Sequence, residues 1–156
     1  MNWTALTETI GLCLISVVIE AVSVTKTGKE WFESLKQPRL ALPFPVWYLI
    51  GGFYYIMCGI IAYRLFLDQE SGHFCLTLSL LILMMLGNAL PNIYLFRQHS
   101  LRRFYLSGIP FTIILTALYI RLLQVDTFSS WILFPYFLWL IYDFYYFRNL
   151  MKLNNQ

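Results

Sequence analysis

The chain alternates between long apolar stretches and short polar connections. A helix needs about 20 apolar residues to cross the hydrocarbon core of a bilayer. Five stretches reach that length, and they cover residues 3–24, 45–67, 74–96, 104–123 and 131–151. The pattern predicts an all-α membrane protein, a five-transmembrane-helix bundle in which residues 1–156 form a single domain.

Composition points to the same surroundings. Of the 156 residues, 59% are hydrophobic and 12% are charged, about half of the roughly 25% charged residues of soluble domains. A small globule has too much surface to hide so much apolar material from water. The lipid bilayer is therefore the expected environment, and the net charge of +3 is too small to indicate a nucleic-acid partner.

The basic residues sort to one side of the predicted bundle. With five spans, the first loop, the third loop and the C-terminal tail share a side, and they carry Lys26, Lys29, Lys36, Arg39, Arg97, Arg102, Arg103, Arg148 and Lys152. The opposite side has only Arg64 and Arg121. Because Lys and Arg concentrate in cytoplasmic loops, we expect the N-terminus outside and the C-terminus in the cytosol.

Short motifs along the chain occur in a recognisable order. They are Trp31-Phe32-Glu33-Ser34-Leu35-Lys36-Gln37-Pro38 with Pro43, then Tyr55 and Gly59, then Asn88-Ala89-Leu90-Pro91, and finally Pro135-Tyr136-Phe137-Leu138-Trp139. In order and spacing they resemble the motifs of the TspO/MBR family (tryptophan-rich sensory protein / translocator protein). The resemblance covers essentially the whole chain.

Several positions depart from the family pattern. Leu40 and Gly51 stand where the family has tryptophans, and Gly87 stands at the family's asparagine, with Asn88 one residue along. One residue turns a helical side chain by about 100°, so Asn88 does not simply inherit that asparagine's role. The chain resembles a divergent member, and the drift of its motifs favours a bacterial inner membrane over a mitochondrial outer membrane.

The resemblance implies a five-helix bundle, often a homodimer, with a pocket that opens toward the first loop. Family members bind porphyrins and other tetrapyrroles, and the animal proteins bind cholesterol and drug-like molecules. Roles proposed for the family include tetrapyrrole or sterol transport, stress sensing and light-dependent porphyrin breakdown. No required cofactor is implied, although a porphyrin or haem could be the bound ligand.

The spacing of aromatic and small residues outlines a candidate ligand site. A flat apolar ligand needs stacking rings and few polar anchors. Residues three and four apart share a helix face, which groups Tyr136, Trp139 and Asp143 in the fifth span and Tyr55 with Gly59 in the second. With the family resemblance, the expected ligand-binding residues are Pro43, Tyr55, Gly59, Asn88, Pro91, Tyr136, Trp139 and Asp143. The alternative is that these residues only pack helices together.

Asp143 lies near the middle of the fifth span, where an ionised carboxylate costs about 2.5–3.5 kcal/mol. Our hypothesis is that it lines the pocket and contacts a polar or cationic ligand group; the alternative is a helix–helix hydrogen bond. Glu20, near the end of the first span, is interpreted as structural, facing headgroups or Lys26. Asn88 is expected either to bond carbonyls freed by a kink at Pro91 or to point into the cavity.

No catalytic or metal-binding constellation appears in the sequence. It has no serine–histidine–carboxylate set, no glycine-rich phosphate loop and no Cys/His cluster, so we assign no catalytic residue and no metal ligand. The sequence favours a receptor or carrier for a hydrophobic planar ligand, foremost a tetrapyrrole or a sterol-like molecule, with residues 25–44 as a lid. The alternatives are a porphyrin-modifying enzyme that uses Trp139 in photo-oxidation, and a membrane scaffold without a small-molecule ligand.

Overall fold

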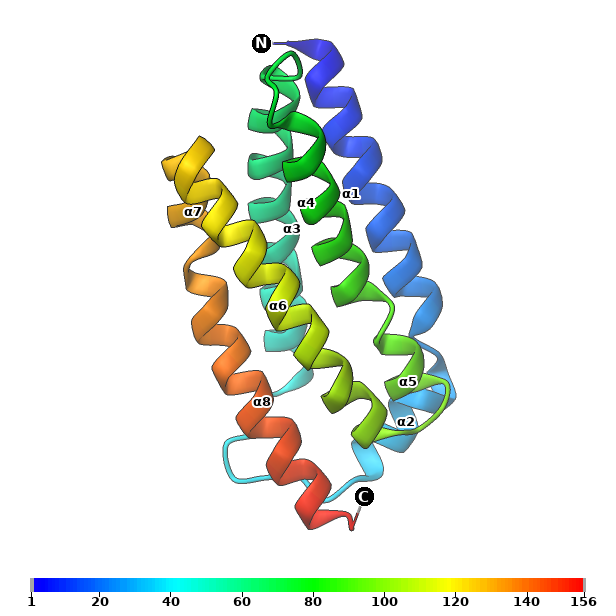
Figure 1. Cartoon of the computed structure of the whole chain (residues 1–156). Coiled ribbons are helices and arrows are strands. Elements are labelled where there is room, and N and C mark those ends of the chain that lie inside the picture. The colour runs from blue at the N-terminus through cyan, green and yellow to red at the C-terminus, as the bar shows by residue number, and fades with distance from the viewer. Residues whose placement is uncertain (1, 156) are drawn as a thin grey trace.

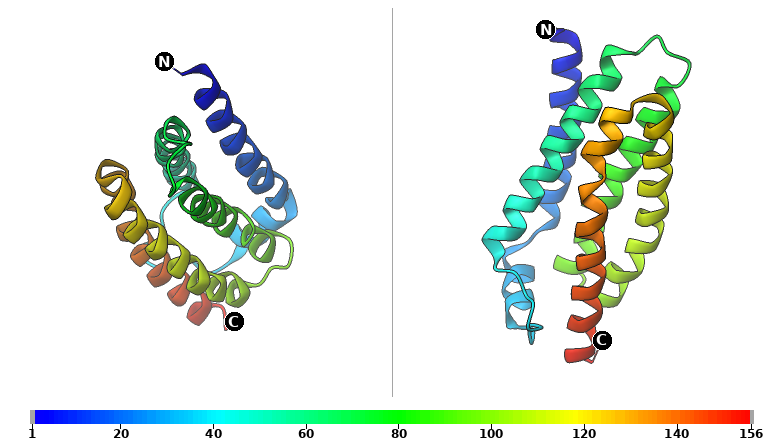
Figure 2. Two further views of the ribbon diagram at one scale, coloured as in Figure 1. Left: turned by 45° about the horizontal axis from the view of Figure 1, so that its top comes forward. Right: turned by 90° about the vertical axis from the view of Figure 1, so that its left-hand side faces the viewer.

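The computed structural model describes residues 2–155, except for the side chain of Phe44. The described residues form eight helices (Figure 1): α1 Trp3–Ser23, α2 Lys26–Ser34, α3 Phe44–Leu67, α4 Phe74–Ala89, α5 Asn92–Phe96, α6 Leu101–Val125, α7 Thr127–Leu133 and α8 Pro135–Leu153. The long helices run along one common direction, and the two termini lie at opposite ends of the bundle (Figures 1 and 2). That arrangement agrees with the predicted odd number of spans.

Four segments are long and apolar enough to cross a membrane: α1, α3, the α4–α5 pair and α6. The fifth, α8, is less apolar because it carries Asp143, Arg148 and Lys152 among many aromatic residues. It runs beside α6 in Figure 1 and contacts it. The predicted five-helix bundle is therefore present, with α8 as its most polar member.

Proline interrupts the third span. Helix α4 ends at Ala89 and α5 begins at Asn92, because Pro91 has no backbone N–H to continue the hydrogen-bond ladder. The side-chain amide of Asn92 donates to the carbonyl oxygens of Asn88 and Ala89, both at 3.3 Å. The kink expected at Pro91 is present as a two-residue interruption between α4 and α5, in which Leu90 and Pro91 keep helical backbone angles. Asn92 rather than Asn88 bonds the exposed carbonyls.

Two segments, the last predicted span and the first loop, are divided differently in the structure. The stretch expected to span from residue 131 is divided into the short helix α7 and the longer α8, which begins at Pro135, a residue suited to the first turn of a helix. The first loop contains α2, whose N-terminus is capped by the Thr25 hydroxyl accepting a hydrogen bond from the Gly28 N–H at 3.0 Å. Apart from Thr25, only residues 35–43 of that loop lie outside helices.

Buried side chains form two clusters at different levels. The larger, between α3, α4, α6, α7 and α8, includes Ile61, Leu81 and Leu118, all fully buried. The second lies toward the α2 and α5 end and includes Phe32 and Tyr146. It holds α2, α5 and the C-terminal half of α8 together.

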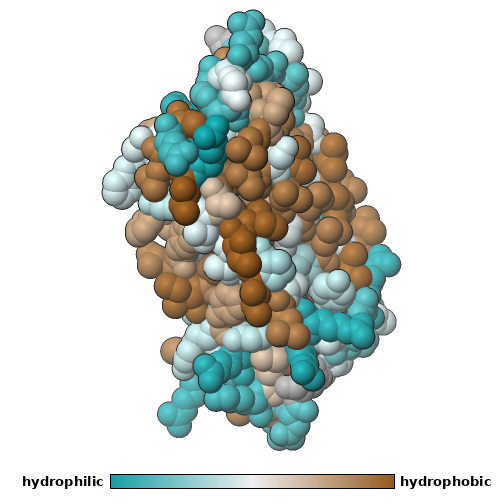
Figure 3. Space-filling view, viewed as in Figure 1, coloured by the Kyte–Doolittle hydropathy of each residue, from teal (hydrophilic) through white to brown (hydrophobic). Residues whose placement is uncertain are grey.

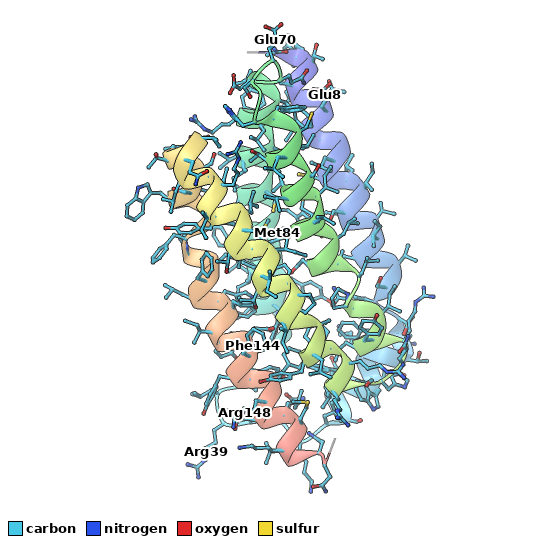
Figure 4. All side chains as sticks on the ribbon, in the orientation of Figure 1. Glu8, Arg39, Glu70, Met84, Phe144 and Arg148 are labelled. Carbon is cyan, nitrogen blue, oxygen red and sulfur yellow. The ribbon has the colours of Figure 1, made fainter. Side chains whose placement is uncertain are left out.

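The surface is banded. On the face shown in Figure 3, an apolar zone covers the middle of the molecule, and polar residues gather at both ends. Glu8 and Glu70 mark one end and Arg39 and Arg148 the other (Figure 4). Large apolar side chains such as Ile15, Phe53 and Ile141 are more than 60% exposed, which is stable only against lipid. The chain is an integral membrane protein.

Candidate functional site

A cavity of about 140 Å³ lies between α1, α3, α4, α6 and α8. Members of both buried clusters line it, so it lies where the two clusters meet. Phe144, one of the lining residues, marks its level between α6 and α8 in Figure 4. Nine of its lining residues are aromatic: Trp47, Tyr54, Phe104, Tyr105, Phe111, Tyr136, Trp139, Phe144 and Phe147.

Glycines shape the cavity in two different ways. A Cβ atom at Gly108 would lie 2.8 Å from the ring of Phe144, and one at Gly87 would lie 3.1 Å from the ring of Phe111. These two glycines allow rings to pack closely against the helix backbone. A Cβ atom at Gly51, by contrast, would meet nothing within 4 Å, so this position leaves the space open.

Two hydrogen bonds fix polar groups at the cavity wall. The hydroxyl of Tyr136 donates to Oδ1 of Asn88 at 2.9 Å, which joins α8 to α4. The hydroxyl of Tyr55 donates to Oε2 of Glu20 at 2.6 Å, which joins α3 to α1. Asn88 therefore points into the cavity and bonds a tyrosine. Glu20 also lines the cavity, which corrects its interpretation as a residue facing headgroups or Lys26.

Asp143 lines the same cavity from α8. Among the described residues, none donates a hydrogen bond to its carboxylate and none forms an ion pair with it. Its oxygens are not sealed in the protein interior, so they are accessible from the cavity. The helix–helix hydrogen bond considered for this residue is absent from the described part of the chain.

The wall has a distinctive charge and ligand chemistry. Its described lining residues include two carboxylates, Glu20 and Asp143, and no lysine or arginine. No histidine, cysteine or methionine is among these described residues either, so a haem iron would find no imidazole or sulfur ligand from them. Over residues 2–155, no group of three His, Cys, Asp or Glu side chains could hold a metal ion.

An aromatic cluster separates the cavity from the non-helical segment 35–43. The rings of Trp47 and Trp139 meet edge to face at 5.1 Å, and Trp47 also contacts Tyr146 at 5.3 Å. The cluster also fastens the segment. Trp47 Nε1 donates to the Leu42 carbonyl at 3.1 Å, the Tyr142 hydroxyl to the Leu40 carbonyl at 2.7 Å, and the Tyr146 hydroxyl to Oε1 of Gln37 at 2.7 Å.

The structure brings together five of the eight residues predicted for the site: Asn88, Pro91, Tyr136, Trp139 and Asp143 line the cavity. Pro43 precedes α3 as its N-cap and does not line it. Tyr55 and Gly59 share the face of α3 that meets α1. Tyr55 bonds Glu20 there, and a Cβ atom at Gly59 would lie 3.8–3.9 Å from side chains of Cys13 and Thr9.

Other lining residues were not predicted, and some of them had a signal in the sequence. Glu20 is a carboxylate within a predicted span, the same feature that singled out Asp143. Gly51 was visible as a small residue where the resembling family has tryptophan. Phe104 and Phe111 come from α6, which carries none of the quoted motifs, so no signal distinguished them from lipid-facing residues.

These features define a small integral membrane protein whose helical bundle encloses an aromatic cavity with isolated polar groups. The model of the TspO/MBR family matches residues 9–149, and the chain belongs to this family. Proteins of the family bind porphyrins or sterols. The search of curated proteins found no match. The family resemblance drawn from the motifs is confirmed.

Proposed function

We propose that this protein is a membrane receptor or carrier that binds a hydrophobic planar ligand, a tetrapyrrole or a sterol-like molecule, in the cavity between its helices. The observation that carries the proposal is the wall itself, in which nine aromatic rings surround a few fixed polar groups. Rings supply flat apolar contact, and isolated polar groups orient a ligand. Family membership supports the same class of ligand.

The volume of the cavity sets a condition on binding. Drug-sized ligands occupy sites of about 300–1,000 Å³, and a cavity of about 150 Å³ holds benzene. The 140 Å³ present here admits about one ring, so a tetrapyrrole requires the wall to move. Trp47 and Trp139 form the wall nearest segment 35–43, and displacement of that segment with them would enlarge the site.

A titration of the detergent-purified protein with protoporphyrin IX, followed by tryptophan quenching in dim light, tests the proposal. We expect saturable one-site binding that weakens in Trp139→Phe, which removes an indole from the wall. Trp131→Phe is the matched control, because Trp131 is 67% exposed and does not line the cavity. Non-saturable binding, or equal Kd values for Trp139→Phe and Trp131→Phe, would remove the cavity as the ligand site.

A second candidate function is modification of a bound porphyrin under light. The supporting observation is a series of close rings, in which Trp139 contacts Trp47 and Tyr142 at 5.1 Å each, and Tyr142 stacks on Tyr146 at 6.0 Å. Such a series could pass an oxidising equivalent away from an excited ligand. Illumination of the loaded protein would then change its absorbance spectrum with turnover, whereas a receptor or carrier returns the porphyrin unchanged.

For orientation, we propose that the C-terminus faces the cytosol of a bacterial cell. The support is the concentration of basic residues at the end of the bundle that holds α2, α5 and the end of α8, including Arg39 and Arg148 (Figure 4). Fusion of alkaline phosphatase or of green fluorescent protein to the C-terminus tests this. We expect the green fluorescent protein fusion to fluoresce and the alkaline phosphatase fusion to be inactive. An active phosphatase fusion with a dark fluorescent protein fusion would show the opposite orientation.

A further inference from the structure

We propose that the cavity selects a flat aromatic ligand that carries a protonated amine, with the cationic nitrogen directed at Asp143. This inference rests on the proposed function, because it specifies the charge of the ligand in the same cavity. It rests on two observations. The Asp143 carboxylate has no hydrogen-bond or ion-pair partner among the described residues, and the described aromatic wall around it contains no lysine, arginine or histidine.

The two carboxylates of the wall differ in what already satisfies them. Glu20 accepts a short hydrogen bond from Tyr55 at 2.6 Å. Asp143 receives no hydrogen bond and no ion pair from any residue between 2 and 155. A carboxylate inside a membrane is costly unless a positive charge or a donor meets it. Because the described protein supplies neither at Asp143, the ligand is the group that can.

Several donors and bases near the cavity are committed elsewhere. The Tyr136 hydroxyl donates to Asn88, and the side-chain amide of Asn92 donates to backbone carbonyls. Arg97 donates to the Val22 carbonyl at 2.7 Å and Arg103 to Gln98 at 2.6 Å, both exposed interactions outside the wall. The wall thus has a net negative charge whenever its carboxylates are ionised, which favours a cation and disfavours an anion.

The aromatic wall narrows the class of cation. Ring faces carry negative electrostatic potential and attract cations in addition to making apolar contacts. Trp139 lies one helical turn from Asp143 on α8, so a ring stacked beside Trp139 can place an attached nitrogen at the carboxylate. The 140 Å³ volume is close to the roughly 150 Å³ that holds benzene, so a fused system of a few rings requires a smaller displacement of the wall than a complete tetrapyrrole does.

The test compares two ligands of almost the same shape and different charge. At pH 8, 9-aminoacridine is a cation and acridine is uncharged. Binding of each to the detergent-purified protein would be followed by ligand fluorescence and tryptophan quenching. We expect the cation to bind at least tenfold more tightly. In Asp143→Asn, which keeps the shape and removes the charge, this preference should fall to less than threefold while acridine binding stays within threefold of wild type.

Two further variants make the outcomes distinct. Glu8→Gln makes the same chemical change at an exposed carboxylate at the far end of the bundle (Figure 4), and it should leave the preference intact. Gly51→Phe places a ring in the cavity and should abolish binding of both ligands.

Equal binding of the two ligands, both blocked by Gly51→Phe, would overturn the charge selection and leave the proposed function standing. A preference for the cation that survives Asp143→Asn, or an absence of saturable binding of either ligand, would also overturn the selection. Binding of both ligands that persists in Gly51→Phe would place them outside the cavity, and protoporphyrin binding that likewise persists would overturn the proposed function as well.

Discussion

Two adjacent glycines on α3 allow a sharp test of whether the cavity is the binding site. Gly51 lines the cavity and Gly52 does not, and a Cβ atom at either position would meet nothing within 4 Å. Phenylalanine at either position therefore attaches to the backbone without a clash. Gly51→Phe places its ring at the cavity, whereas Gly52→Phe places the same ring on the exposed side of the helix.

The expected size of the effect follows from the cavity volume. A phenyl group matches a space that is close to the roughly 150 Å³ known to hold benzene. At about 24 cal/mol per Å³ of cavity, filling 140 Å³ would stabilise the fold by at most about 3 kcal/mol. Loss of hydration at Glu20 and Asp143 reduces that gain. Both variants also gain helix propensity over glycine, by up to about 0.5 kcal/mol.

We therefore expect Gly51→Phe to have a Tm equal to or above that of Gly52→Phe, while its affinity for protoporphyrin IX falls at least tenfold. Gly52→Phe should bind as wild type does. The assay is quenching titration with thermal unfolding of the same samples. Unchanged binding in Gly51→Phe, or an equal loss in both variants, would refute the assignment of the ligand to this cavity.

The remaining predictions concern stability at the two ends of the bundle. Gly28→Ala should destabilise the protein by about 1–3 kcal/mol, as overpacking does, because its methyl group would overlap the Phe96 carbonyl. Thermal unfolding measures this loss. The control variant Gly72→Ala should show no comparable loss, because a Cβ atom at Gly72 meets nothing within 4 Å. At the other end, Arg64 donates to both carboxylate oxygens of Asp126, at 2.6 and 2.9 Å, and lowers the pKa of that carboxyl. Wild type should therefore be more stable than Arg64→Gln by its full margin above about pH 4, the ordinary pKa range of an aspartate. That margin should shrink as the pH falls through the lowered pKa of Asp126. A stability difference that stays constant down to about pH 2 would contradict the ion pair's role.

Much of the architecture follows from the sequence because local chemistry determines it. The length of each apolar stretch requires a crossing helix in lipid, since no water is available to bond a free backbone. Pro91 lacks an N–H, so the third span had to be interrupted near it. The spacing of Tyr136, Trp139 and Asp143 placed them on one face of α8, and the structure finds all three at one cavity.

Tertiary packing decided what each face meets. Helix α3 is apolar on all sides, so its pattern does not distinguish the side toward lipid from the sides toward α1 or the cavity. Tyr55 and Gly59 share a face as predicted, yet that face meets α1, and the cavity lies along Trp47, Gly51 and Tyr54 instead. Periodicity defines the members of a face and carries no information about its neighbour.

The charge of the cavity likewise depends on how the helices pack. Glu20 and Asp143 are 123 positions apart in the sequence, and only the packing of α1 and α8 around one space brings their carboxylates to the same wall. The sequence by itself placed each acid within a predicted span. The folded bundle decided that Tyr55 satisfies one of them and that the other faces the cavity without a partner, because hydrogen bonds between distant helices depend on their relative rotation and depth.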